Sequence, residues 1–254
     1  MNICLFTKQE IDKPLSLHDA RAKHIIKILK KKVGDTFNAG IIEGSSGIAL
    51  ITAIDDIDEN GTLSFSFTPQ GDGKPLYPLI MIIGFPRPIQ LKRLLRDMAG
   101  LVVCEIHLVA TELGEKSYLN SSLATSDAGR TMLVEGVVQA AGTHIPSLYI
   151  HNSLNECLDV IEKNLKQDYV LFALDNVNAK DSLSSVLERE SSLLKETRTA
   201  VACIGSERGW TDKERELLES KGYKRLRMGN RVLRTETAAT VAASLILGAM
   251  GYLN

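Results

Sequence analysis

Residues 200–214 read AVACIGSERGWTDKE and join an apolar run to a helix start through a loop that contains two glycines. The run Ala200–Ile204 shows no polar alternation, which is typical of a strand buried on both faces. Thr211 and Glu214 form a T-x-x-E capping box, which predicts that a helix begins directly after the loop. Such a loop presents free backbone N–H groups to a ligand, although a tight structural turn explains the same pattern.

Three further apolar runs resemble this strand, and together they predict a parallel sheet flanked by helices. The runs cover residues 78–85, 106–110 and 169–174. Amphipathic segments alternate with them and predict helices over 89–101, 132–141 and 213–221. The stretch Thr235–Leu253 predicts a last helix rich in small residues, which suit close contact inside the domain or with a second subunit.

The N-terminal part has a different pattern. Short β-like runs at 36–42, 48–54 and 62–67 alternate with glycine- and aspartate-containing turns, which predicts a small barrel or sheet. One helix is expected over 17–32, with an apolar face made of Ala22, Ile25, Ile26 and Leu29. Residues 69–78, PQGDGKPLYP, predict a linker, so we expect two domains, 1–70 and 79–254.

Composition narrows the class of protein. The 254 residues carry 30 lysines and arginines against 31 acidic residues, a net charge of −1. This balance argues against nucleic-acid binding over the whole surface but not in a local patch.

No apolar run approaches the ~18 residues that span a bilayer, and the N-terminus lacks the features of a secretory signal. We therefore expect a cytoplasmic protein without membrane contact. The cysteines are Cys4, Cys104, Cys157 and Cys203, spaced as in a reduced protein rather than a zinc or disulfide framework.

A motif near the C-terminus is more specific. Residues 228–239, MGNRVLRTETAA, together with IGSERGW at 204–210, resemble the SPOUT class of RNA methyltransferases, and within it the ribosomal RNA small subunit methyltransferase E family. That family typically has IGPEGG where this chain has IGSERG, and LGxR[IV]LRxETA where this chain has MGNRVLRTETA. The segment 24–35, HIIKILKKKVGD, is similar to the family's N-terminal motif. The sequence departs from the pattern at Ser206, Arg208 and Gly142, where the family usually has proline, glycine and arginine.

The resemblance implies a fold and a cofactor. It implies an α/β domain with a C-terminal trefoil knot and a parallel sheet, preceded by a PUA-like β-barrel that binds RNA. Three loops at strand ends would hold S-adenosylmethionine, and Gly205 and Gly229 would let the backbone approach the ligand closely. The implied cofactor-binding residues are Leu174, Ile204, Gly205, Glu207, Gly209, Met228, Gly229, Val232 and Leu233.

The resemblance further implies methylation of N3 of a specific uridine in 16S ribosomal RNA. Arg234 is our candidate for stabilising negative charge on a uracil carbonyl. Glu236 would orient Arg234 or accept the proton, although an acid in a first helical turn is also favoured by the helix dipole. No metal is expected, because the five histidines are scattered along the chain.

Several cations are expected to contact RNA phosphates. Six of the twelve residues 21–32 are basic, although a solvated helix face explains such a cluster as well. The expected RNA-binding residues are Arg21, Lys23, Lys27, Lys30, Lys31, Arg87 and Arg231. The resemblance also implies a homodimer that pairs through the C-terminal helix. Two alternatives stay open: methylation of another RNA, and a catalytically inactive RNA-binding protein of the SPOUT class.

Overall fold

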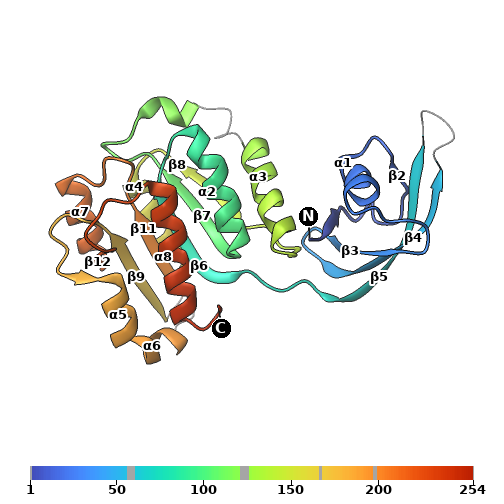
Figure 1. The fold of residues 1–254 in the computed structure, drawn as a ribbon. Helices are drawn as coiled ribbons and strands as arrows, with labels where there is room; N and C mark the ends of the chain where they lie inside the picture. Colours follow the sequence, from blue (N-terminus) through green and yellow to red (C-terminus); the bar gives the residue numbers. More distant parts are fainter. Residues whose placement is uncertain (1, 56–60, 121–125, 166–167, 197–198, 254) are drawn as a thin grey trace. The chain divides into compact units, whose positions relative to one another are not determined.

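The computed structural model in Figure 1 describes residues 2–55, 61–120, 126–165, 168–196 and 199–253. The chain divides into two compact units. Unit 1 comprises Met1–Pro75 with Val137–Ile145, and unit 2 comprises Leu76–Gly136 with Pro146–Asn254. The division at Pro75 falls inside the predicted linker. The return of Val137–Ile145 to unit 1 was not predicted, because a short helical end carries no sequence signal for its packing partner.

Unit 1 is built on a five-stranded sheet in the order β1-β3-β4-β5-β2. The strands are β1 (Cys4–Phe6), β2 (Leu15–Ser16), β3 (Thr36–Ile41), β4 (Ser45–Asp55) and β5 (Thr62–Asp72). The β1–β3 pair is parallel and the other pairs are antiparallel. Phe6, Ile51 and Leu63 are fully or almost fully buried in its core, and the Phe6 and Phe65 rings lie 4.9 Å apart.

The predicted linker is wrong over its first residues, because β5 continues to Asp72. Proline has no N–H to donate and is normally confined to edges and bulges of a sheet. Pro69 meets this condition: it pairs with Gly47 beside a register shift, and β2 pairs with β5 only at Leu63 and Thr62 among the described residues.

The helix expected over 17–32 is also wrong at both ends. The chain forms α1 (Ala20–Lys23), capped by the Asp19 carboxylate, and continues as the π-helix η1 (His24–Ile28). A π-turn holds more residues than an α-turn, and so it rotates the following side chains off the predicted face. Leu29, expected on the apolar face, is 42% exposed, and the chain leaves the helix at Lys30, where φ is 53°.

Unit 2 contains a seven-stranded sheet in the order β10-β12-β9-β11-β6-β7-β8, and every pair in it is parallel. The strands are β6 (Tyr77–Gly84), β7 (Val103–Val109), β8 (Ser147–His151), β9 (Tyr169–Leu174), β10 (Asp181–Ser182), β11 (Thr199–Ile204) and β12 (Lys224–Arg227). The four predicted apolar runs correspond to β6, β7, β9 and β11. The strands β10 and β12 were missed because they are short and rich in polar residues, and β8 because it has only five residues.

Helices cover both faces of this sheet (Figure 1). They are α2 (Pro88–Gly100), α3 (Ser126–Gln139), α4 (Leu154–Asn164), α5 (Leu183–Arg189), α6 (Ser191–Glu196), α7 (Asp212–Ser220) and α8 (Thr235–Ala249), with a 3₁₀ turn, η2 (Lys116–Asn120). Ile80 and Ile82 of β6 pack in one core with residues of α4 and α7. Leu79 and Met81, which alternate with them, are also fully buried, and α8 packs against β6, α2 and α5. No helix in the described residues is both long and apolar enough to cross a membrane.

Candidate active site

A cavity of about 250 Å³ lies at the carboxyl ends of β9, β11 and β12, which are neighbours in the sheet. Three loops line it: one follows β9, one follows β11, and one joins β12 to α8. Eight of the nine predicted cofactor-binding residues line the cavity: Leu174, Ile204, Gly205, Glu207, Gly209, Met228, Val232 and Leu233. Parallel strands bring their carboxyl ends to one edge, and this is why three segments distant in sequence meet here.

The loop after β11 is a tight turn. The Gly209 N–H donates to the Ser206 carbonyl at 2.8 Å, and Gly209 has φ of 76°. A Cβ on Gly205 would lie 2.9 Å from the Gly209 carbonyl carbon, so the turn itself requires a glycine there. Gly205 therefore has a role in the turn itself, and its predicted close approach to the ligand stays a prediction. Arg208, which departs from the family motif, is not among the described residues with positive φ, so the turn holds its side chain without backbone strain.

Gly229 is the predicted cofactor residue that does not line the cavity. A Cβ built on Gly229 meets no atom within 4 Å, whereas its φ is 79°. Glycine is suited to this position because its backbone is left-handed, not because the chain is crowded. Gly229 thus shapes the β12–α8 loop, and Met228 and Leu233 of that loop reach the cavity.

Trp210, the one tryptophan of the chain, was not predicted as a site residue. Its side chain is 1% exposed and lines the cavity, and its Nε1–H donates to the Leu174 carbonyl at 3.3 Å. This bond connects the loop after β11 to the end of β9. A lone tryptophan directly after a glycine loop was the available sequence signal.

A buried carboxylate organises the loop after β9. Asp175 is 8% exposed, and one of its oxygens accepts the Val177 N–H at 3.0 Å. Its other oxygen accepts from Arg215 Nε at 2.6 Å and from Arg225 at 3.4 Å. The Asp175 carboxylate raises the pKa of Arg215. Sequence reasoning missed this network because Arg215 belongs to α7, far along the chain from Asp175.

A second pocket, of about 340 Å³, adjoins the cavity and shares Glu207, Val232 and Leu233 with it. Arg234 and Glu236, the predicted catalytic residues, line this second pocket rather than the cavity. Arg234 precedes the first residue of α8 and is exposed, and Glu236 in the first turn is 5% exposed. Within the described part of the chain, no carboxylate forms an ion pair with the Arg234 guanidinium.

Arg87 and Gln90 complete the wall of the second pocket. Arg87 directly precedes α2, and its Nε donates to the Glu207 carboxylate at 3.1 Å. The negative charge of Glu207 raises the pKa of Arg87. This ion pair connects the start of α2 to the turn that follows β11, and the predicted RNA contact of Arg87 stays a prediction.

The expected RNA-binding cations of unit 1 separate into two groups. The Arg21 guanidinium forms ion pairs with Glu10 and Asp19, both at 2.8 Å, and lies over the Phe6 ring. Arg21 therefore helps to hold unit 1 together, and its predicted contact with RNA stays a prediction. The exposed members are Lys23, Lys27 and Lys30, whereas Lys31 is half-buried. In unit 2, Arg231 is exposed on the β12–α8 loop.

Comparison with known proteins identifies the family. Residues 73–247 match the family model for an RNA methyltransferase domain. The ribosomal RNA small subunit methyltransferase E of Treponema pallidum is 39% identical, over 97% of this chain and 91% of that protein. The chain belongs to the ribosomal RNA small subunit methyltransferase E family. Methyltransferase E 1 of Borreliella burgdorferi is 33% identical to this family member, over 97% of each chain.

Solved structures support the fold of the methyltransferase E family for this chain. The Neisseria gonorrhoeae ribosomal RNA small subunit methyltransferase E, bound to S-adenosyl methionine, superposes with a TM-score of 0.73 at 18% identity. The superposition covers 98% of this chain and 97% of that one. A structure described as a probable rRNA-methyltransferase, from Porphyromonas gingivalis, gives the same TM-score and covers 99% of this chain and 100% of that one. At this identity the likeness speaks for the fold alone.

Proposed function

We propose that this protein is an S-adenosylmethionine-dependent methyltransferase that modifies N3 of a specific uridine in 16S ribosomal RNA, in the cytoplasm. The observation that carries the proposal is the 39% identity to a methyltransferase E over nearly the whole of both chains. The cavity at the ends of three adjacent strands supports it, because ligands of α/β proteins bind at the carboxyl ends of the strands.

The cavity residues fit the cofactor. Ile204, Met228 and Leu233 provide apolar side chains that suit the two faces of an adenine ring. Backbone N–H and C=O groups of the three loops suit the polar edge of that ring. When bound, S-adenosylmethionine supplies a methyl group carried on a positively charged sulfur.

The second pocket suits the target base. N3 of uracil lies on the Watson–Crick edge, so the base has to be unpaired or flipped out before it can react. Loss of the N3 proton places negative charge on the neighbouring carbonyl oxygens. Arg234, which lines this pocket, would stabilise that charge; such a donor contributes about 3–4 kcal/mol where the bound substrate excludes water. Glu236, in the same wall, would orient Arg234 or accept the proton.

We further propose the parts of the fold and assembly that the family resemblance implies. Unit 2 would contain the trefoil knot, and unit 1 would be a PUA-like RNA-binding domain whose exposed Lys23, Lys27 and Lys30 contact phosphates. The protein would act as a homodimer through α8. Four alanines of α8 are buried within unit 2: Ala238, Ala239, Ala242 and Ala243. The exposed side chains Val241 and Leu245, 36% and 39% exposed and one turn apart, would therefore meet the partner.

The direct test maps methylated nucleotides by mass spectrometry in ribosomal RNA from cells with and without the gene. One N3-methyluridine in 16S RNA that depends on the protein is the expected result. Loss of a methyl group from another RNA would favour the first alternative. No change in any RNA, combined with unmeasurable cofactor binding in calorimetry, would favour the inactive RNA-binding protein.

Variants of the second pocket test the proposed role of Arg234. Arg234→Ala is expected to lower kcat about 100-fold or more with little change in cofactor affinity, because charge stabilisation is lost only during the reaction. Arg231→Ala provides the matched control on the same loop. It is expected to raise the KM for RNA and to leave kcat within about threefold. An Arg234→Ala enzyme with unchanged kcat would remove Arg234 from the mechanism.

A further inference from the structure

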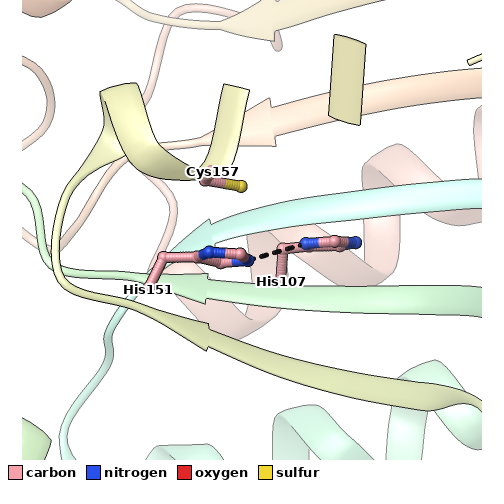
Figure 2. Close-up of side chains that lie close together, drawn as sticks. All are labelled: His107, His151 and Cys157. Atoms are coloured by element: carbon pink, nitrogen blue, oxygen red, sulfur yellow. Dashed lines mark hydrogen bonds between the residues drawn. The ribbon is translucent and has the colours of Figure 1, made fainter. Parts of the chain in front are cut away.

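Three buried side chains lie close together (Figure 2). They are at the β7–β8 end of the unit 2 sheet, away from β9 and β12. His107 belongs to β7, His151 ends β8, and Cys157 belongs to α4. One nitrogen of each imidazole and the Cys157 sulfur all lie within 4.8 Å of one another. The three residues are 1%, 5% and 0% exposed, and none of them lines the cavity or the second pocket.

The two imidazoles point their inner nitrogens at each other. His107 Nδ1 and His151 Nε2 are 2.9 Å apart and share one hydrogen bond, as Figure 2 shows. The sulfur of Cys157 lies beside this pair. The set therefore offers two nitrogen donors and one sulfur donor in a confined space, from elements that are adjacent in the fold.

Carboxylates lie behind both imidazoles. Glu105, two residues before His107 on β7, places Oε2 3.0 Å from His107 Nε2. Glu156, next to Cys157, places Oε1 4.0 Å from His151 Nδ1. A metal-binding histidine usually donates its outer N–H to a carboxylate or carbonyl, which leaves the inner nitrogen free to bind the ion. His107 has that hydrogen bond, whereas His151 Nδ1 faces a carboxylate at 4.0 Å, which is beyond hydrogen-bond distance.

We propose that His107, His151 and Cys157 bind a single zinc ion through three of its four tetrahedral positions. Imidazole and thiolate ligands select zinc over magnesium and calcium, which prefer oxygen ligands. The ion would join β7, β8 and α4, so its role is structural. It is separate from the reaction at the cavity and does not depend on the proposed function.

The distances require a modest adjustment. Zinc binds nitrogen at about 2.0–2.1 Å and sulfur at about 2.3 Å, so a tetrahedral site separates two nitrogens by roughly 3.4 Å. The inner nitrogens would open by about 0.5 Å from their present contact, and the sulfur would move inward by up to about 1 Å. Zinc would displace the thiol proton of Cys157 to solvent, and the proton that the two imidazoles share would move to the outer nitrogen of His151, Nδ1, so that each imidazole stays neutral. Glu105 and Glu156, whose side chains are 37% and 47% exposed, offer the ion a route from the surface.

The opposing explanation is a metal-free histidine pair that shares a proton in the core. The two explanations differ in the part played by sulfur, since a shared proton needs only the imidazoles. Cobalt(II) distinguishes them, because a thiolate bound to cobalt gives an intense near-ultraviolet charge-transfer absorption. Cys203 provides a matched control, because it is fully buried in the same core as Cys157 but is not one of the three donors.

The experiment titrates the full-length, chelator-treated protein with cobalt(II) and then displaces the cobalt with zinc. One cobalt per chain with the thiolate band is expected for the wild type and for Cys203→Ala, and a band lowered at least tenfold for Cys157→Ala. Glu105→Gln, a partly exposed position, is expected to weaken zinc affinity about 10–100-fold without disturbing the core. Zinc is also expected to raise the Tm of the wild type but not of Cys157→Ala. Absence of the band in the wild type, or an equal band in Cys157→Ala, would overturn the proposal.

Discussion

The indole Nε1–H of Trp210 donates a hydrogen bond to the carbonyl oxygen of Leu174, 3.3 Å away, at the floor of the candidate cofactor cavity. The bond joins the ends of two neighbouring strands, β9 and β11. Without this bond the buried indole N–H would lose its acceptor, so the bond favours one relative position of the two segments. The shape of the cavity thus depends on a residue that precedes the capping box of α7 by one position.

Trp210→Phe tests this relationship. The substitution keeps an aromatic ring but removes the hydrogen bond to the Leu174 carbonyl, and we expect the free energy of unfolding to fall by about 1–3 kcal/mol. Calorimetry is expected to show S-adenosylmethionine affinity reduced several-fold. Tyr223→Phe is the control, because Tyr223 is buried in the same core but does not line the cavity. Equal affinities in the two variants would show that the bond does not shape the site.

Variants of Gly229 test whether glycine is needed there for its left-handed backbone or for space. With φ of 79° and no atom near its absent Cβ, it should tolerate Gly229→Asn, because asparagine adopts the left-handed region readily. Gly229→Val should distort the β12–α8 loop, because a β-branched residue is strongly disfavoured there. We expect near-normal cofactor affinity for the asparagine variant and at least tenfold weaker binding for valine, with both proteins folded by circular dichroism. Equal weakening in both would point to direct ligand contact instead.

The exposed lysines of unit 1 predict that RNA binding depends on salt concentration. Reversing Lys23, Lys27 and Lys30 to glutamate should weaken RNA binding and flatten the dependence of log K on log salt, because fewer counterions are released. Cofactor affinity should not change. A control with the same change of charge reverses three exposed lysines of unit 2: Lys163, Lys195 and Lys213. If the slope of log K against log salt falls equally in both variants, the unit 1 lysines form an ordinary solvated surface.

The proposed homodimer has its test on α8. Ala242 is fully buried, so a large residue there would disrupt the core of unit 2 rather than an interface. Leu245→Arg changes an exposed position and is expected to give a folded monomer in light scattering, with loss of methyl transfer. Leu50→Arg, at a position of similar exposure in unit 1, should leave the oligomeric state unchanged. A wild-type protein that is monomeric and active would contradict the dimer.

Acid is expected to lower the stability of unit 1, because it protonates Glu10. Hydrogen bonding to Arg21 lowers the pKa of Glu10 to about 2, below its ordinary value near 4.3. A carboxylate with a lowered pKa stabilises the folded state above its unfolded pKa, and this contribution is lost as the pH falls from about 4.5 toward 2. Glu10→Gln is therefore expected to flatten the fall of the urea midpoint over this range. The same pH dependence in the variant and the wild type would assign the acid sensitivity to other groups.

Local patterns in the sequence determined the alternation of buried strands and helices in unit 2 and the start of α7. The capping box at Thr211 and Glu214 forms as predicted, because it depends only on residues three apart. The same reasoning failed for the segment after Lys23, where a π-turn changes the period, and for Pro69, which a bulge accommodates. In both places the neighbouring chain, and not the local pattern, sets the conformation.

Only the tertiary structure decided which side chains meet. Trp210 reaches Leu174 across 36 residues, and Arg215 reaches Asp175 across 40, because parallel strands align their ends regardless of their order in the chain. The same alignment brings His107 within 2.9 Å of His151, although 44 residues separate them. A periodic pattern identifies the buried face of each element, but the pairing of elements arises from long-range packing, which no local stretch of sequence encodes.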